Sequence, residues 1–349
     1  MIKILNIVYP IIQAPMAGGF TTPELVAAVS NAGGLGSLGA GYMHPTEIKK
    51  TIQEIRGLTD KPFAVNLFIP KSHYASAEQI TKACRDIEES CSELALKINS
   101  VSPPYSPSFE QQLNVIIEEK IPILSFTFGL LHSESIKKLK ENNTVLIGTA
   151  TNLAEASLLE KSGVDMIVAQ GSEAGGHRST FIGKMEDGLI HLTELVTQLS
   201  EKIKIPIIAA GGIMNGDDIA KLLSLGAVAV QMGTAFLTCT ESGTHPAFKK
   251  LLLSTKQDET VLTRAFSGAY ARGIKNKFTE RMESKKENIL DYPIQNVLTN
   301  QMRKIAKAES NTDFMSLCAG QAAQYCRDLS AVDLIRSLIF NMNDSNNER

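Results

Sequence analysis

The sequence predicts an α/β fold, a (β/α)8 barrel of the TIM type, from three observations. Eight short apolar segments alternate with segments of helical periodicity, which is the element count of a closed barrel. The last two apolar segments end in glycine, where barrels of this kind commonly bind a phosphate. At 349 residues and 43% hydrophobic content, the chain is long enough for one large barrel, so no second domain is required.

The first two strands are predicted at residues 11–16 and 33–41. Between them, Thr22 can cap a helix that has Pro23 in its first turn. The second strand contains the letters G-x-G-x-x-G at residues 34–39, but that dinucleotide fingerprint should follow a strand and open a helix. Here a helix precedes the glycines, which lie within an apolar strand. We therefore favour glycines that let a barrel strand pack closely over a Rossmann site.

The third strand is predicted at residues 63–69, after a helix at residues 44–56. Asn66 is its one polar residue, and a buried amide must find partners, either in neighbouring backbone or in a ligand. The crossover at residues 70–120 is long, with helical patterns at 77–96 and 110–119 around a Ser/Pro-rich loop at 100–108. We expect this crossover to be an insertion above the barrel.

The remaining strands are predicted at residues 123–129, 145–150, 166–169, 205–213 and 228–235, with a helix at about 217–225 before the last one. A polar loop follows the sixth strand at Gln170. In it, Gly175 and Gly176 remove side chains just before His177, so a flat ligand could approach the backbone with the imidazole at its edge. The alternative is a surface turn with a solvated histidine. Loops that leave the C-terminal ends of parallel strands are where α/β folds place their sites, so we favour the functional interpretation.

The seventh and eighth strands end in residues suited to a phosphate. Gly211 and Gly212 follow the seventh, and Gly233 and Thr234 follow the eighth. Free backbone N–H groups and a nearby helix start can form an anion cradle there, which implies a cofactor or a sugar phosphate.

The rest of the chain divides into a predicted lid and a C-terminal part, after a barrel core at residues 1–238. Residues 239–312 are too long for an ordinary loop and are expected to be a mostly helical lid over the barrel mouth. Residues 313–349 are expected to supply a closing helix at about 313–340 and a disordered tail. For Arg264, Arg272 and Lys275 we favour solvated loop charges over anion contacts.

Composition excludes several classes of function. With 35 basic and 37 acidic residues the net charge is −2, and no basic stripe would hold nucleic acid or anionic lipid. Five scattered cysteines without a CxxC motif argue against a disulfide framework and against a metal site, and fit a reducing cytoplasm. No eighteen apolar residues run together, and we expect neither a signal peptide nor a membrane span.

Eight motifs together resemble the nitronate monooxygenases, once called 2-nitropropane dioxygenases, and the likeness covers nearly the whole chain. They are QAPMAGG at 13–19, VNLF at 65–68, SFTFG at 125–129, AQGSEAGGHR at 169–178, AAGGI at 209–213, QMGTAFL at 231–237, TRAFSG with ARG at 263–273, and AGQ at 319–321. No single motif is decisive, but their number, order and spacing make chance an implausible explanation. The resemblance implies an FMN-binding TIM barrel that oxidises nitronates with dioxygen.

The resemblance also assigns residues. It implies that Pro15 and Met16 flank the flavin, that Asn66 and Gln170 bond to its ring system, and that Gly175 and Gly176 lie against it. Gly212 and the segment Gln231, Met232, Gly233 and Thr234 would hold the phosphate end, and His177 matches the catalytic histidine. Some family members have a histidine where this chain has Thr127, which puts that side chain's role in doubt.

Two alternatives stay open. FMN-dependent enoyl-acyl-carrier-protein reductases share the barrel and an EAGGH motif, although GSEAGGHR with TRAFSG looks more like the monooxygenases. A flavin-binding protein without turnover could keep the cradle and lose the base, and the presence of His177 argues against it. The substrate expected is a small-molecule nitronate, propionate 3-nitronate being one candidate, and the protein is expected to be a monomer or homodimer.

Overall fold

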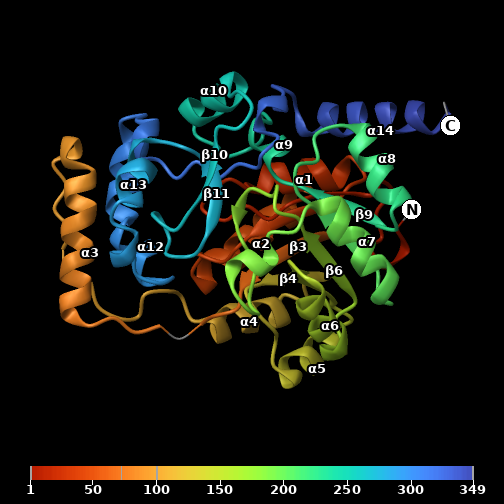
Figure 1. Ribbon diagram of the computed structural model, residues 1–349. Coiled ribbons are helices and arrows are strands. Elements are labelled where there is room, and N and C mark those ends of the chain that lie inside the picture. The colour runs from red at the N-terminus through yellow and green to blue at the C-terminus, as the bar shows by residue number, and fades with distance from the viewer. Residues whose placement is uncertain (1, 72, 100, 348–349) are drawn as a thin grey trace.

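Eight parallel strands form the centre of the computed structural model, which describes residues 2–71, 73–99 and 101–347 (Figure 1). Their order around the sheet is β1-β9-β8-β6-β5-β4-β3-β2. The bounds are β1 Ile11–Gln13, β2 Gly36–Gly39, β3 Phe63–Phe68, β4 Ile123–Thr127, β5 Val145–Ala150, β6 Met166–Gln170, β8 Ile207–Ala210 and β9 Ala229–Met232. The prediction of a TIM barrel is confirmed. Several strands are shorter than predicted. β1 ends at Gln13 because the proline at position 15 has no N–H to continue the ladder.

The sheet closes between β1 and β2 through a short contact. Ile12 and Leu35 form an isolated parallel bridge there. Beyond the bridge the buried Gln13 side chain takes the place of ladder bonds, because its Oε1 accepts from Ser37 N at 3.0 Å and its Nε2 donates to Ser37 O at 3.1 Å. The glycines of β2 serve this packing as predicted, since a Cβ on Gly36 would lie 2.0 Å from the carbonyl oxygen of Val26.

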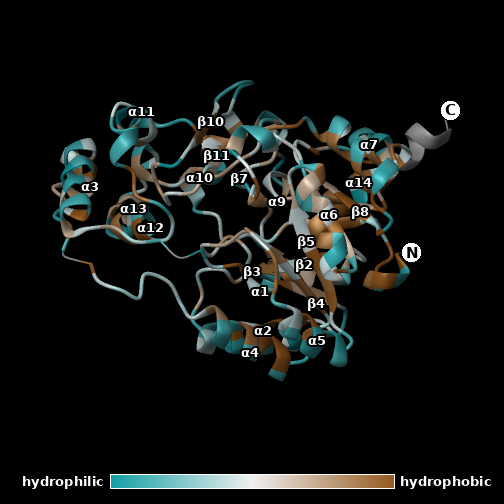
Figure 2. Ribbon diagram, turned by 60° about the horizontal axis from the view of Figure 1, so that its bottom comes forward, coloured by the Kyte–Doolittle hydropathy of each residue, from teal (hydrophilic) through white to brown (hydrophobic). Residues whose placement is uncertain are grey.

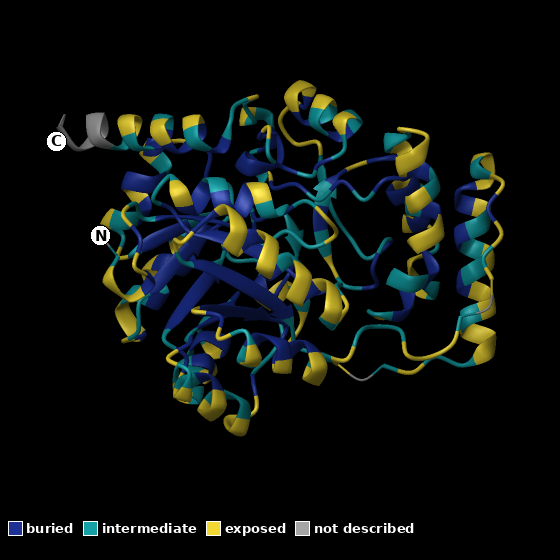
Figure 3. Cartoon of the chain, turned by 180° about the vertical axis from the view of Figure 1, so that it is seen from behind, coloured by how far each residue is buried: buried dark blue, intermediate teal, exposed yellow. Residues whose placement is uncertain are grey.

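Helices surround the barrel and turn their polar faces outward, while the strands are buried (Figures 2 and 3). Thr22 accepts a hydrogen bond from Leu25 N and so caps α1, as its position before Pro23 predicted. The barrel helices are α1 Pro23–Asn31, α2 Pro45–Leu58, α4 Phe109–Glu118, α5 Ser133–Glu141, α6 Leu153–Ser162, α7 Leu192–Lys202, α8 Gly216–Ser224 and α9 Thr234–Leu237. Short 3-10 helices lie at Lys3–Leu5, Ser92–Leu94, Met185–Gly188, Lys286–Asn288, Thr312–Phe314 and Ala323–Tyr325.

The segment after β9 contains more strand than the sequence suggested. It has the helices α10 Pro246–Ser254, α11 Lys277–Glu283, α12 Ile294–Leu298 and α13 Asn300–Ala308, and also a hairpin of β10 Thr260–Thr263 and β11 Ala271–Ile274. The hairpin pairs with β7, Gly176–His177, in a second small sheet. Through this pairing the predicted lid and the loop after β6 become one structure. The division of the chain into barrel, lid and C-terminal part remains a prediction.

The crossover at residues 70–120 carries the helix α3, Ala77–Ser90, far from the barrel helices (Figure 1). Its apolar side packs on α11 and the neighbouring 3-10 helix. Ion pairs join the two segments, with Arg281 on Glu93 at 2.7 Å and Lys285 on Glu89 at 2.8 Å. Residue 100, at the start of the predicted Ser/Pro-rich loop, lies outside the described residues.

The predicted C-terminal helix begins later than expected. It is α14, Ala331–Asn347, and residues 315–322 are loop in place of helix. The reason is local, because Ala319 N donates to Arg272 O and Gly320 N donates to Thr234 Oγ1, so this segment bonds to other loops. Residues 341–347, predicted to be disordered, continue α14, and residues 348–349 lie outside the described residues.

Candidate active site

A cavity of about 330 Å³ lies at the carboxyl ends of the barrel strands, beneath the segment that follows β9. This volume is in the range of small-molecule sites, about 300–1,000 Å³. The structure brings all thirteen sequence-predicted residues to its wall: Pro15, Met16, Asn66, Gln170, Gly175, Gly176, His177, Gly211, Gly212, Gln231, Met232, Gly233 and Thr234.

One end of the cavity is built from glycine backbone. Gly211 and Gly212 have φ of 137° and 67°, which an L side chain rarely adopts, and a Cβ on Gly175 would lie 2.5 Å from Gly320 N. The N–H groups of Gly212 and Gly233 make no hydrogen bond within the part of the chain that is described. Unpaired N–H groups at strand ends suit the phosphate that the sequence predicted.

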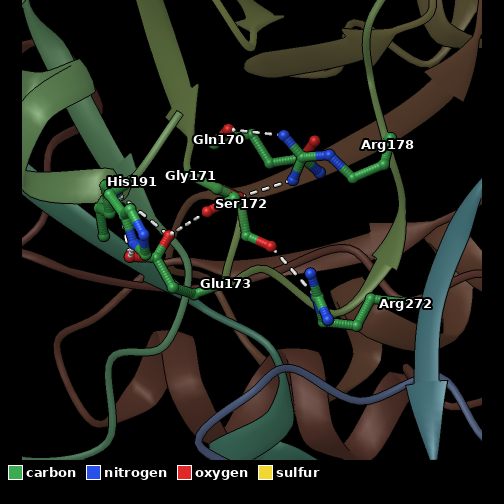
Figure 4. A network of polar contacts seen from close by, with 8 residues as sticks. Gln170, Gly171, Ser172, Glu173, Arg178, His191 and Arg272 are labelled. Atoms are coloured by element: carbon green, nitrogen blue, oxygen red, sulfur yellow. Dashed lines mark hydrogen bonds and ion pairs between the residues drawn. The ribbon is translucent and has the colours of Figure 1, made fainter. Parts of the chain in front are cut away.

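The loop after β6, which carries Gly175 and Gly176, is held by two buried arginines (Figure 4). Arg178 donates to the carbonyl oxygens of Gly171 at 2.6 Å, Gln170 at 3.0 Å and Gly188 at 2.8 Å. Arg272 donates through Nε to Ser172 O at 3.1 Å. Burial lowers the pKa of Arg178 to about 10, so the side chain stays charged at neutral pH. The loop is therefore fixed from inside the protein before any ligand binds.

Of the three cations expected to be solvated, Arg272 is not, because it is only 8% exposed. The difference arises because Arg272 lies in β11, opposite Gly176 in the small sheet. Arg264 and Lys275 form ion pairs with Asp291 and Glu280.

His177 lies in β7 with its ring in the cavity wall. Its Nε2 is 2.8 Å from Ser267 Oγ, and no bond to Nδ1 is present in the described residues. Burial and, secondly, the charge of Arg303 lower the pKa of His177 from 6.5 to about 4. The imidazole is therefore neutral at pH 7 and has a nitrogen lone pair that can accept a proton.

Four aromatic rings surround the imidazole. Their centroids lie between 5.7 and 6.5 Å from that of His177, in edge-on or tilted orientations, and they belong to Tyr42, Phe68, Phe128 and Tyr292. An apolar wall of this kind excludes water, which is the physical origin of the low histidine pKa.

Three of the polar side chains at the strand ends, those of Asn66, Thr127 and Gln170, make bonds within the protein. Asn66 Nδ2 donates to Ser125 Oγ at 2.9 Å, a side-chain partner that the sequence reasoning did not consider. Gln170 uses both amide atoms on the His177 loop, donating to His177 O at 2.9 Å and accepting from Ser179 N at 3.0 Å. Thr127 hydrogen-bonds Ser179. The expected contacts of Asn66 and Gln170 with a flavin ring therefore stay predictions, with the Asn66 Oδ1 as the free acceptor.

Sequence reasoning missed several residues of the cavity wall, among them Tyr42, Ser267 and Arg303. Ser267 stands in TRAFSG, a motif that gave a resemblance and no role. Tyr42 and Arg303 lie in a turn and a helix with no recognisable motif, so only the fold brings them to the cavity. Across the described residues, no group of three or more His, Cys, Asp or Glu is placed to hold a metal ion, and no helix is long and apolar enough to cross a membrane.

Comparison with known proteins gives consistent similarities. The family model described as nitronate monooxygenase matches residues 1–341. A probable nitronate monooxygenase of Staphylococcus saprophyticus is 42% identical over 343 residues, which cover 98% of this chain and 96% of the relative. The structure of a nitroalkane oxidase from Streptomyces ansochromogenes superposes with a TM-score of 0.92 at 36% identity, covering 98% of each chain. FabK from Thermotoga maritima superposes with a TM-score of 0.78 at 30% identity, covering 99% of this chain and 96% of that one.

Proposed function

The chain belongs to the nitronate monooxygenase family and is an oxidoreductase, and from this premise we propose that it binds FMN and oxidises alkyl nitronates with dioxygen to a carbonyl compound and nitrite. The observation that supports this most is the division of one cavity into a glycine cradle and a neutral histidine. The glycine cradle suits the phosphate of a cofactor, and the neutral histidine suits an acid–base step on a substrate.

The residues present fit FMN. The N–H groups of Gly212 and Gly233 would bind its phosphate, which explains why these positions have no side chain. Pro15 and Met16 would flank the ring, Gly175 and Gly176 would lie against it, and the Asn66 Oδ1 would accept from a ring N–H. FMN rather than FAD is favoured because no adenosine-binding fingerprint accompanies the cradle.

When bound, the flavin supplies the acceptor for the substrate's electrons and the contact with dioxygen. The protein's task is to place the carbon–nitrogen unit of the substrate against it. His177 Nδ1 is the atom that would remove the α-proton from a nitroalkane that has not yet ionised. For a preformed nitronate, the same ring would orient an oxygen of the anion as its other tautomer, in which Nδ1 carries the hydrogen and Nε2 accepts from the Ser267 hydroxyl.

A visible spectrum and an anaerobic titration test this function. The purified protein should be yellow, or become so when FMN is supplied, and a nitronate should bleach the flavin in the absence of oxygen. A protein that stays colourless with FMN would overturn the proposed cofactor. A yellow protein that no substrate bleaches would be a flavin binder without turnover.

The second candidate is an FMN-dependent enoyl-acyl-carrier-protein reductase, favoured by the structural likeness to FabK. The same titration separates the two, because NADPH followed by an enoyl thioester should leave the flavin unchanged if the first proposal holds. We further propose a cytoplasmic monomer or homodimer that acts on small molecules and binds no nucleic acid, as the charge balance suggests.

A further inference from the structure

The charged residues in the cavity wall are all basic. Among the described residues that line it there is no aspartate or glutamate, whereas Arg272, Arg303 and Lys307 are present. Arg272 is engaged with Ser172 and Thr260, and Lys307 is exposed at the end of α13. Arg303 is the half-buried cation of this wall that lacks a full set of partners among the described residues, and its Nε is fully buried.

The bonds of Arg303 occupy one part of the guanidinium only. Its Nη2 donates to Asn296 O at 2.7 Å and to Asn296 Oδ1 at 2.9 Å. Its Nε is buried without a partner, its Nη1 makes no hydrogen bond, and no carboxylate pairs with it in the described chain. By contrast, Arg264 and Arg281 are paired with Asp291 and Glu93. A half-buried guanidinium with an unpaired buried Nε is stabilised when an anion binds to its remaining donors.

The Tyr42 hydroxyl is a second donor on the same wall. Tyr42 lines the cavity and makes no hydrogen bond with the described residues, and its ring contacts those of Phe68 and Tyr292. Burial raises the pKa of Tyr42, and the nearby charge of Arg303 acts the other way, so the phenol keeps its proton. Tyr42 and Arg303 thus line the same cavity, and both have donors that can bind an anion there.

This pair is separate from the glycine cradle and belongs to the histidine end of the cavity, where the centroid of the Tyr42 ring is 6.5 Å from that of His177. Arg303 comes from α13, beyond the barrel, whereas the phosphate cradle is formed by the ends of β8 and β9. The reacting carbon must lie beside His177, and the Arg303 charge is close enough to lower the pKa of that histidine. An anion at Arg303 would therefore belong to the part of a substrate that extends from the reacting carbon.

We propose that Arg303, assisted by the Tyr42 hydroxyl, determines substrate specificity by pairing with a carboxylate at the end of the substrate opposite the reacting carbon. This inference rests on the proposed function. Arg303 Nη1 donates to the carboxylate in a charge-assisted bond, and the Tyr42 hydroxyl donates to its second oxygen. Nitronates with a neutral tail lack this bond and leave the guanidinium without a carboxylate partner.

The test compares Arg303→Met with two matched variants. Arg303→Lys keeps the charge without the planar fork, and Lys304→Met removes a charge from the exposed side of the same helix. The substrates are the nitronates of 3-nitropropionate, of its uncharged amide, and of 1-nitropropane. Oxygen consumption gives kcat/KM for each, and the flavin spectrum checks that each variant is folded and loaded.

We expect Arg303→Met to lower kcat/KM for the carboxylated nitronate on the order of 10²-fold and to change kcat/KM for the two neutral substrates far less. Arg303→Lys should lose less, Tyr42→Phe should lose less again, and Lys304→Met should match the wild type. Equal losses on all three substrates, or no loss on any, would overturn the proposal. If Arg303→Met does not fold, the same comparison is made with Arg303→Lys and Tyr42→Phe.

A binding measurement separates failure of this inference from failure of the proposed function. Calorimetry with succinate, which is not oxidised, should show binding to the wild type and at least tenfold weaker binding to Arg303→Met. If no nitronate is turned over but this difference is found, the proposed function fails and the carboxylate site stands. If nitronates are turned over and succinate binds both proteins equally, the carboxylate site is wrong.

Discussion

His177 Nε2 lies 2.8 Å from Ser267 Oγ, and this contact fixes which nitrogen of the imidazole faces a ligand. The Ser267 hydroxyl has one hydrogen, and Ala269 O lies 3.2 Å away as its acceptor. If the hydroxyl donates to that carbonyl, its oxygen accepts from His177, and the ring carries its hydrogen on Nε2. Nδ1 is then left with the lone pair.

Ser267→Ala should therefore lower turnover several-fold without loss of flavin. The ring would lose the bond that selects its tautomer, a contribution of about 1 kcal/mol for a hydrogen bond between neutral groups. Steady-state oxygen consumption measures the effect, and Ser267→Thr, which keeps the hydroxyl, is the control. An alanine variant with wild-type kcat would mean that the ring needs no such bond.

His177→Asn should depress turnover of neutral nitroalkanes far more than turnover of preformed nitronates. Proton removal is lost with the imidazole and is expected to account for 10²-fold or more, on the order typical of general bases. Orientation of an anion can be partly replaced by water or backbone donors. Oxygen consumption with both forms of one substrate is the measurement, and equal losses would mean that His177 positions the substrate without acting as a base.

Gly233→Ala should weaken FMN binding on the order of tenfold and leave the fold intact. A Cβ at this position would lie 3.4 Å from Ala14 Cβ and 3.8 Å from Met16 Sδ, which are ordinary contacts, so any loss reflects crowding of the ligand. Gly212→Val, although also expected to weaken binding, is a poorer test because φ of 67° strains any side chain there. Flavin titration gives the affinity, with Gly57→Ala as control, since nothing lies within 4 Å of a Cβ there.

The stability of the flavin-free protein should rise with pH between about 4 and 6.5 through His177. Its folded pKa of about 4 is below the ordinary 6.5, so in this window the unfolded chain binds a proton that the folded chain does not. Above pH 6.5 the contribution is complete, and it is lost as the pH falls. Denaturant titrations of wild type and His177→Gln should differ in pH dependence across this window, and parallel curves would contradict it.

The fold was predictable because its information is local. Strands such as β5 and β6 are apolar runs bounded by polar turns, and caps such as Thr22 mark helix starts. The hairpin β10–β11 was missed because its four-residue strands have no alternating apolar pattern and are set by pairing with β7, which lies about ninety positions earlier. The same applies to α14, since residues 315–322 are drawn out of helix by distant partners.

The cavity was predictable where motifs mark the ends of strands, and not where a residue acts through the fold. His177 and the glycines could be recognised from their residue types and from their positions after the predicted strands. Arg303 is one cation among several on an ordinary helix. It stands out only in the structure, where no carboxylate of the described residues pairs with it and its Nε is buried without a partner. Arg272 was misjudged for a related reason, because charge alone does not show that a residue lies in a central strand of a small sheet.

The contact between α3 and α11 constrains the order in which the chain can fold. Arg281 meets Glu93 across 188 positions and Asn288 meets Asp86 across 202, so during synthesis α3 leaves the ribosome long before its partner exists. Its apolar residues, Ala83 and Ile87 among them, stay uncovered through that interval. Separations of this length slow folding and extend the time in which an exposed apolar face can associate with other chains. The cap Ser76 and two of the first four residues of α3, Glu78 and Gln79, are polar, and the helix carries six charged side chains in its fourteen residues. These side chains keep α3 hydrated until the second half of the protein has been synthesised.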